Sequence, residues 1–322
     1  MSHHTSKYMQ LNIRVLLLLC TLFAGVLCAC KKNDLDEKLA EEEKKLVEYI
    51  TDNYGEAAVN LGGGAWLVKA HEETDGATVE AGNYILWNLK ITNQITEELE
   101  YTSELSNIKF PGSYVDGGPE ITVVLSSKID EGLIQMRKGE KGNVYIPSRW
   151  LFCDFQPRIY SVEIVDVIRD LSVYQEALMG GYIKRAHRGA SADTIKNVVS
   201  TIDNTEYNVM YHICDEGKGE AITDGMNIET KTSISYMIRM NREGDIHSYQ
   251  VNQDLIWNTN KINTLTKTNC VGEILKKMKT GGKVDVTMPS KLFWEDKDLP
   301  ANNNDQFIIP KWSVVVFTIT IK

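Results

Sequence analysis

The sequence predicts an α+β protein that contains two copies of one domain, each built on a mainly antiparallel sheet. Three observations support this prediction: apolar and polar residues alternate in several segments, two amphipathic helices are indicated, and the chain contains an internal repeat. Each helix precedes a series of strands, so each domain is expected to begin with a helix.

The two predicted helices cover residues 33–50 and 174–187. In the first, Leu39, Leu46 and Ile50 recur at helical spacing among Glu and Lys residues that would form a solvated face. In the second, Leu178 and Ile183 lie on the apolar side. Strands are predicted where apolar residues alternate with polar ones or follow each other in short β-branched runs, over residues 83–91, 161–168, 232–240 and 314–321.

The internal repeat relates residues 131–148 to residues 273–290 without a gap. Glu, Leu, Met, Gly, Lys, Val, Pro and Ser coincide at a single offset of 142 residues, which takes Met136 to Met278. Similarity at a domain-sized period indicates duplication, because the repeats of solenoids run about 20–50 residues. We therefore expect a boundary near Asp170, with one domain over residues 30–170 and another over residues 171–322.

Each copy of the repeat predicts a short helix, a strand and a turn. The helix presents a Leu and the shared Met to a core, and a Gly ends it, as Gly commonly does at a helix C-terminus. A Pro closes the strand, because Pro cannot pair inside a sheet. The residues concerned are Leu133, Met136, Gly139 and Pro147 in the first copy, and Leu275, Met278, Gly281 and Pro289 in the second.

Residues 1–29 are predicted to be a secretory signal. The cations Lys7 and Arg14 precede an apolar run over residues 15–27, and Ala29 stands directly before Cys30. The run is too short for a permanent membrane helix, which needs about 20 apolar residues. The segment resembles a bacterial lipoprotein signal, which implies that Cys30 becomes the first mature residue and carries lipid. An ordinary signal peptide cut after Ala29 is the alternative.

A lipid on Cys30 would anchor the chain to a membrane of the cell envelope. Because Lys31 rather than Asp follows Cys30, outer-membrane sorting is favoured over inner-membrane sorting. The residues leave open whether the protein faces the periplasm or the outside.

Composition excludes other classes of partner. The formal net charge of the whole chain is −9, and it argues against nucleic acid, whose phosphates select basic surfaces. No His or Cys shows the spacing of metal ligands, so neither a metal nor a cofactor is expected. After Cys30 the cysteines are Cys153, Cys214 and Cys270, an odd number without CxxC spacing, which favours buried thiols over a disulfide framework.

The repeated unit, followed by Phe307-Ile308-Ile309-Pro310 and Val315-Val316-Phe317, resembles the second half of an FKBP-type peptidyl-prolyl isomerase. The resemblance is best over residues 270–322 and fair over residues 130–168. The whole chain also looks like two-unit, FKBP-like lipoproteins of Gram-negative bacteria that lack an assigned activity. This resemblance implies two FKBP-like domains, each an antiparallel sheet wrapped around a short helix with an apolar pocket between them.

The resemblance also implies the residues of a peptide-binding pocket in the second domain. They are Met237, His247, Val271, Phe293, Ile308, Ile309 and Phe317.

Several of these residues depart from the family pattern. Val271 stands where the family has a pocket-floor Trp, Phe293 lacks the hydroxyl of a family Tyr, and His247 with Ser248 replaces a Phe-Asp pair. In the first domain, Ile129 takes the Trp position and Leu151 the Tyr position. The loss of aromatic groups argues against an efficient isomerase.

Three hypotheses follow for the function. In the first, the protein binds peptide or protein segments, including proline-containing ones, and assists protein folding in the envelope. In the second, the domain over residues 171–322 is an active peptidyl-prolyl cis–trans isomerase. In the third, the protein is a non-enzymatic scaffold of an envelope assembly, with filled pockets.

Overall fold

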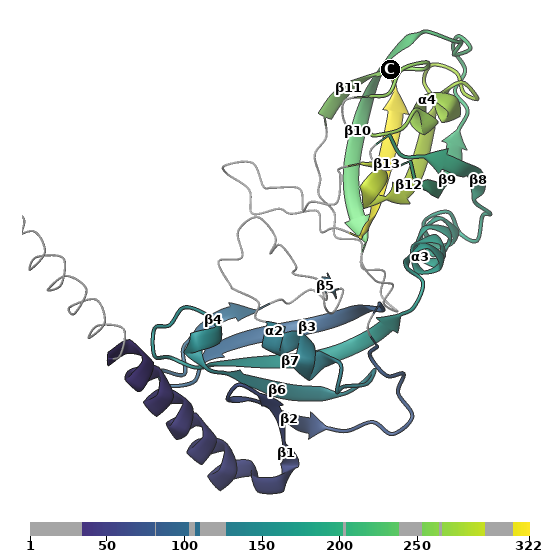
Figure 1. Ribbon diagram of the computed structural model, residues 1–322. Helices are drawn as coiled ribbons and strands as arrows, with labels where there is room; N and C mark the ends of the chain where they lie inside the picture. Colours follow the sequence, from purple (N-terminus) through teal and green to yellow (C-terminus); the bar gives the residue numbers. More distant parts are fainter. Residues whose placement is uncertain are drawn as a thin grey trace, which may run out of the picture.

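The computed structural model contains two antiparallel sheets, which Figure 1 shows as two separate groups of strands. The residues that it describes are 34–80, 82–102, 107–109, 127–201, 204–237, 253–263, 266–293 and 312–322. The predicted signal and Cys30 lie outside these residues. Among the described residues, no helix combines the length and the apolar character needed to cross a lipid bilayer.

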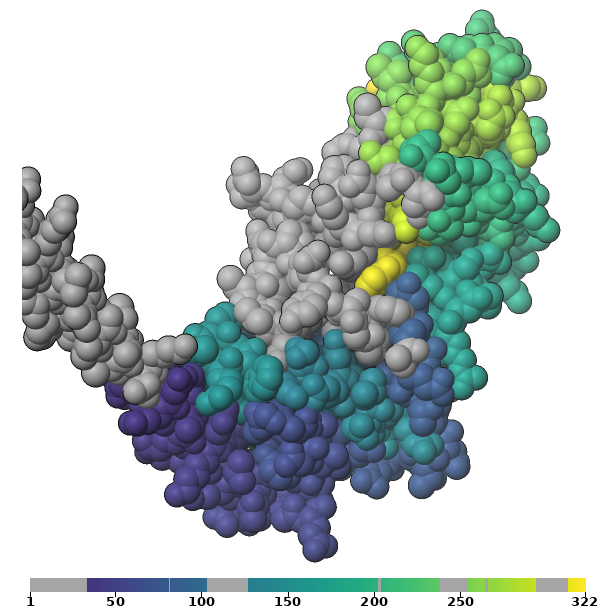
Figure 2. All heavy atoms as spheres, in the orientation of Figure 1, coloured from purple at the N-terminus to yellow at the C-terminus, as the bar shows by residue number. Residues whose placement is uncertain are grey.

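The first domain begins with a helix over residues 34–54, which leads into the turn η1 (Gly55–Ala57). Figure 2 shows this helix, in purple, at the surface of the molecule. The strands that follow are β1 (Ala58–Gly62), β2 (Ala65–His71), β3 (Tyr84–Asn93), β4 (Leu99–Thr102), β5 (Asn107–Lys109), β6 (Lys141–Ile146) and β7 (Arg158–Ile168). The short helix α2 (Ser127–Leu133) precedes β6, and the turn η2 (Ser148–Trp150) follows it.

The second domain begins with α3 (Leu171–Ala186). The carboxylate of Asp170 accepts a hydrogen bond from the Val173 amide at 3.1 Å, as an N-cap does, and Lys184 and Arg185 lie in the last turn. The strands are β8 (Asp193–Val199), β9 (Glu206–Asp215), β10 (Asn227–Met237), β11 (Gln253–Asn258), β12 (Lys283–Pro289) and β13 (Val314–Ile321). The helix α4 (Cys270–Leu275) precedes β12, and the turn η3 (Ser290–Leu292) follows it.

The two sheets have the same strand order. The first runs β1-β2-β6-β7-β3-β4, with β5 also paired to β3, and the second runs β8-β9-β12-β13-β10-β11. All of these neighbours pair antiparallel. The predicted fold class is therefore confirmed: it is α+β, with two antiparallel sheets, each associated with a short helix.

The repeat seen in the sequence is also a repeat of hydrogen bonds. The carbonyl oxygen of Met136 accepts from the Val79 amide, and the carbonyl oxygen of Met278 accepts from the Ile222 amide, both at 3.1 Å. The two methionine side chains are almost completely buried. The segment after each short helix is thus tied back to the chain that leads into β3 or β10, the strand next to the end of each sheet order.

Each sheet is covered on both faces. We call the face toward α2 or α4 the inner face, and the face toward the residue 34–54 helix or α3 the outer face. The inner cores contain Ile129 and Leu133 of α2, or Val271 and Leu275 of α4. On the outer face of the second sheet, apolar residues of α3 pack against the sheet; this cluster comprises Leu178, Met179, Tyr182, Ile183, Met237, Val314 and Val316.

The two glycines that the sequence places at the helix ends do not end the helices: α2 already ends at Leu133 and α4 at Leu275, and both glycines lie in the turns that lead into β6 and β12. Gly139 has φ +90° and Gly281 has φ +82°, a left-handed region that other residues enter only at a cost. A Cβ added to Gly281 would meet no atom within 4 Å, so backbone strain is the main cost of substitution there.

We expect Gly281→Ala to lower the free energy of unfolding by about 1 kcal/mol, because alanine disfavours the left-handed region. Gly180→Ala is the matched control. Gly180 lies inside α3, where a Cβ would make only an ordinary contact with Met210 at 3.7 Å. Alanine should therefore raise the free energy of unfolding by about 0.5–1 kcal/mol at that position. Urea denaturation of the full chain measures both changes, and a shift of the same sign in the two variants would contradict the prediction.

Candidate functional site

Four of the buried aromatic side chains on the inner face of the second sheet form what we call the aromatic cluster. They are Tyr236 of β10, Trp257 of β11, Phe293 after η3 and Phe317 of β13, and each is at most 4% exposed. The Phe317 ring packs edge-on against Phe293, with centroids 5.2 Å apart, and against Trp257, with centroids 6.1 Å apart. Edge-to-face packing of this kind stabilises aromatic pairs beyond the area that they bury.

Strand register positions the centre of this cluster. Phe317 pairs with Ile234 of β10 on one side and with Val286 of β12 on the other, so three neighbouring strands fix its place on the inner face. Phe293 is held by the turn that follows β12, because its amide donates to the Ser290 carbonyl at 2.9 Å. Pro289 ends the strand and lets the chain turn there.

Helix α4 packs against the same core as the cluster. It begins after Thr268, whose hydroxyl accepts from the Cys270 amide at 3.3 Å. Val271, in the first turn, is 1% exposed and belongs to the same core as the four aromatic residues.

Three of the predicted pocket residues come together in this way. Val271, Phe293 and Phe317 share one core on the inner face. His247, Ile308 and Ile309 lie outside the described residues.

The structure contradicts the prediction for Met237. Its side chain lies on the outer face and packs against α3 together with Val314 and Val316. Side chains alternate between the two faces of a strand, so a shift of one residue in the alignment exchanges the faces. The inner position belongs to Tyr236.

Trp257 was also missed in the sequence. The sequence carries no signal for its face, because Leu255-Ile256-Trp257 is an uninterrupted apolar run. In the structure the Ile256 side chain is 61% exposed, whereas Trp257 is 2% exposed. This is the alternation of a strand with one buried face. Its indole Nε1 is buried and has no hydrogen-bond partner in the part of the chain that the structure describes.

The aromatic cluster is uncharged and poor in titrating groups. Burial raises the pKa of Tyr236 to about 12, so its phenol is neutral at physiological pH. The cluster is therefore a buried, uncharged group of rings that includes a neutral phenol and an indole N–H.

The first domain has a different set of side chains at the corresponding positions. Tyr160 pairs with Ile91 and Val144 in the same register as Phe317 with its neighbours, so it takes the place of Phe317. Ile129 is buried in this core, and Leu151 packs against it partly buried. The inner face of the first domain therefore presents one aromatic ring among aliphatic groups at these positions.

Asn93 takes the place of Tyr236 in the first domain and stabilises a turn. Its side-chain oxygen accepts from the amides of Ile95 and Thr96, at 3.0 and 3.2 Å. A further groove, of about 540 Å³, lies beside the residue 34–54 helix, between Tyr49 and Phe155. Charged side chains of that helix line it, so it differs from the aromatic cluster of the second domain.

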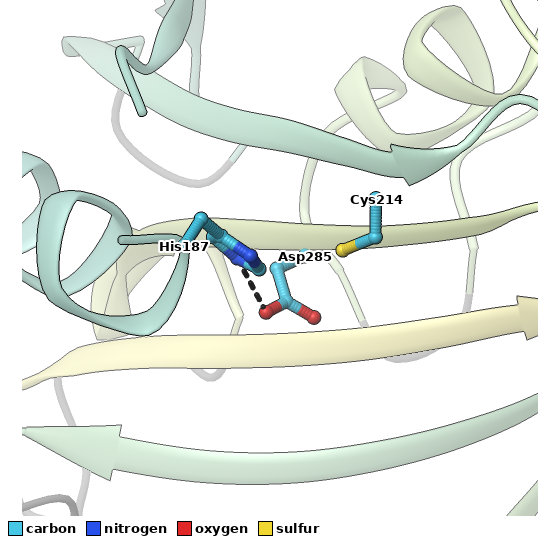
Figure 3. Close-up of side chains that lie close together, drawn as sticks. All are labelled: His187, Cys214 and Asp285. Carbon is cyan, nitrogen blue, oxygen red and sulfur yellow. Dashed lines mark hydrogen bonds and ion pairs between the residues drawn. The ribbon is translucent and has the colours of Figure 1, made fainter. Parts of the chain in front are cut away.

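A second group of polar side chains lies on the outer face of the second sheet. His187 follows α3, Cys214 lies in β9 and Asp285 in β12, and Figure 3 shows the Asp285 carboxylate between the His187 ring and the Cys214 sulfur. His187 Nε2 is 3.0 Å from Asp285 Oδ2. These are the residues in the described part of the chain whose types and spacing suit a metal ion.

Comparison with solved structures finds peptidyl-prolyl isomerases of the FKBP type, as the sequence predicted. A peptidyl-prolyl cis–trans isomerase from Pseudomonas syringae matches with 15% identity and a TM-score of 0.33, over 41% of this chain and 95% of that one. The three FKBP domains of wheat FKBP73 match with 13% identity and a TM-score of 0.28, over 82% of this chain and 97% of that one. FkpA from Escherichia coli matches with 17% identity and a TM-score of 0.32, over 48% of this chain and 71% of that one.

No family model and no curated protein matches the sequence. The TM-scores are low, so the function proposed below depends on the residues of this chain.

The three described cysteines are free, and their surroundings differ. Cys153 and Cys214 are exposed, which contradicts the expectation of buried thiols, whereas Cys270 is buried as expected. Burial raises the pKa of Cys270 to about 12. Burial, and then the charge of Asp285, raise the pKa of Cys214.

We expect a thiol reagent to modify Cys153 and Cys214 in the native protein and to leave Cys270 unmodified. The thiolate is the reactive form, and a pKa of about 12 keeps Cys270 protonated at pH 7 to 9 while its burial blocks access. Raising the pH within this range should therefore not expose Cys270 to the reagent, whereas denaturant should. Peptide mapping by mass spectrometry distinguishes the sites, and rapid native labelling of Cys270 would contradict the buried position of α4.

Proposed function

We propose that this chain is a cell-envelope lipoprotein whose second FKBP-like domain binds peptide or protein segments at the aromatic cluster and assists protein folding. The observation that carries the proposal is the packing of Phe293 and Trp257 around Phe317 on the inner face, beside α4. Aromatic side chains bind apolar segments well, because they offer large rigid surfaces at little cost in conformational entropy.

Trp257 adds a polar group to this surface. A buried donor without a partner costs about 1–3 kcal/mol, which a carbonyl oxygen of a bound peptide would offset in part. The proposed ligand is therefore an apolar segment with an accessible backbone carbonyl, such as the one that precedes a proline.

Isomerase activity in the second domain is the second candidate function, and Tyr236 favours it. An X-Pro bond crosses a barrier of about 18–20 kcal/mol, because resonance is lost as the amide twists. A twisted amide is less polar than a planar one, so an apolar wall that prefers the twisted form lowers the barrier without a nucleophile or a metal. Tyr236 supplies an aromatic group at a position where the sequence analysis expected only Met237.

Other features favour binding over fast catalysis. In the family that the sequence resembles, a Trp forms the pocket floor where this chain has Val271, and a Tyr hydroxyl is present where it has Phe293. The close packing of the cluster also supports the third hypothesis, a scaffold with filled pockets, because its members are at most 4% exposed.

Phe317→Leu tests the proposed site, with Tyr160→Leu as the matched control in the first domain. Both side chains are fully buried at equivalent positions of their sheets, so the two substitutions should reduce stability by similar amounts. We expect Phe317→Leu to weaken binding of an unfolded, proline-containing protein at least tenfold. Tyr160→Leu should change it less than twofold. The measurement is fluorescence anisotropy of the labelled unfolded protein with the full chain, after circular dichroism has shown that both variants are folded.

The same proteins distinguish the alternatives when they are assayed for cis–trans isomerisation of a proline peptide. Catalysis by the wild type that falls in Phe317→Leu and persists in Tyr160→Leu would establish an isomerase. Binding without catalysis would support the hypothesis of a folding helper. The absence of both binding and catalysis would support the hypothesis of a scaffold. Equal effects of the two substitutions on binding would overturn the proposed site.

Attachment to the membrane is proposed to depend on Cys30. The support is the signal itself, in which the apolar run and Ala29 stand directly before this cysteine. A single acyl chain binds membranes only marginally, so stable anchoring needs more than one.

We expect Cys30→Ser to move the protein from the membrane fraction to the soluble fraction of cells that process lipoprotein signals. Cys28→Ser is the control, because Leu27 before it is too bulky for the small residue expected at that position. The measurement is fractionation followed by mass spectrometry of the N-terminus. A Cys30→Ser protein that stays with the membrane fraction, without lipid, would contradict the proposed anchor.

A further inference from the structure

The outer face of the second sheet holds three potential metal ligands from three separate segments. His187 Nε2 or Nδ1, Cys214 Sγ and a carboxylate oxygen of Asp285 all lie within 4.8 Å of one another (Figure 3). Asp285 is 5% exposed, His187 is partly buried and Cys214 is exposed. The site is thus anchored inside the protein at Asp285 and reachable from solvent at Cys214.

One oxygen of the Asp285 carboxylate is satisfied and the other is not. Asp285 Oδ2 accepts from the Tyr182 hydroxyl at 3.1 Å and lies 3.0 Å from His187 Nε2. Asp285 Oδ1 is buried and has no hydrogen-bond partner among the described residues. A buried carboxylate oxygen without a partner destabilises the folded state, because its hydrogen bonds to water are not replaced by others. A cation at this point would satisfy it.

The arrangement does not suit nucleophilic catalysis by Cys214. A catalytic cysteine needs a base directly beside its sulfur, whereas here the carboxylate lies between the sulfur and the imidazole. The thiol makes a weak contact, from Sγ to the His212 carbonyl oxygen at 3.7 Å.

We propose that His187, Cys214 and Asp285 bind a divalent transition-metal ion of the zinc type. Sulfur, imidazole nitrogen and carboxylate oxygen are together the ligand set that zinc prefers. Zinc bonds of about 2.0–2.3 Å place its ligand atoms roughly 3.5 Å apart. The separations in the present cluster run up to 4.8 Å, so the longest must shorten by about 1 Å, while the 3.0 Å between His187 Nε2 and Asp285 Oδ2 must lengthen slightly; rotation of the side chains would complete the site.

Two neighbours support the proposed site. Tyr182 donates to Asp285, and a hydrogen bond of this kind orients a ligating carboxylate. The ring of His212 stacks on that of His187, with centroids 4.2 Å apart, so a fourth nitrogen ligand lies beside the site. If His212 remains stacked, water takes the fourth position.

A metal at this point would join the end of α3 to β9 and β12. It lies on the face opposite to the aromatic cluster, so it is a site separate from the proposed peptide surface. The expected effect is on the stability of the second domain and on the attachment of α3 to the sheet, because an ion that binds only the folded state stabilises it.

Cobalt(II) is the probe that tests the proposal, because a cobalt–thiolate bond absorbs in the near ultraviolet and reports the sulfur ligand directly. Titration of the reduced full chain with Co²⁺ should produce this band with one ion per protein, and Zn²⁺ should displace it. Cys214→Ser should abolish the band, whereas Cys153→Ser, which changes the other exposed thiol of the described residues, should retain it.

Thermal unfolding provides the second measurement, and it also shows whether a variant without the cobalt band is folded. Cys214→Ser changes an exposed side chain and should fold, whereas a change at buried Asp285 carries a risk of unfolding. Zn²⁺ should raise the unfolding temperature of the wild type and of Cys153→Ser, and should raise that of Cys214→Ser much less. Absence of the cobalt band in the wild type would overturn the proposal, as would a band or a Zn²⁺ stabilisation that is the same in Cys214→Ser.

Discussion

The structure of the second domain depends on a sheet that is buried on both faces. β10, β12 and β13 pack against α4 on one face and against α3 on the other, so almost every side chain of β12 and β13 lies in one core or the other. Because successive side chains point to opposite faces, the register of these strands decides which core each residue enters. The register therefore places the aromatic cluster on the inner face and the group of His187, Cys214 and Asp285 on the outer face.

Consecutive residues of β10 show how strong this constraint is. Tyr236 and Met237 are adjacent, yet Tyr236 joins the inner core and Met237 packs against α3. A one-residue slip would place the phenol under α3 and the thioether against Phe317. The same alternation in β12 places Val284 and Val286 on the inner face and Asp285 on the outer face. Asp285 is buried there under α3, although the neighbouring residues of the strand are apolar.

The sequence predicted the parts of the fold that depend on local patterns. The repeated unit, the glycine at residue 281 and the last strand over residues 314–321 were all visible, because turn chemistry and β-branched runs are local signals. The sequence did not reveal which face of the sheet Met237 occupies. An alignment to a distant family can be wrong by one residue, and an error of one residue exchanges the two faces of a strand. The His187, Cys214 and Asp285 group was invisible for another reason: its members are far apart in the sequence, and only the pairing of β9 with β12 and the docking of α3 bring them together.

The two copies of the domain share one strand order but carry different side chains at equivalent positions. On the inner face, Asn93 stands in the register position of Tyr236, where it stabilises a turn instead of facing an aromatic wall. On the outer face, Asn143 pairs with Val68 as Asp285 pairs with His212, so a neutral amide and an aliphatic group replace a carboxylate and an imidazole.

These exchanges remove both proposed sites from the first copy while leaving its strand order intact. A sheet covered on both faces needs only apolar volume and correct register, so either copy could lose its polar and aromatic groups without losing the fold. The second copy retains them on both faces. Under the two proposals above, the first copy serves as structural support and the second carries the binding sites.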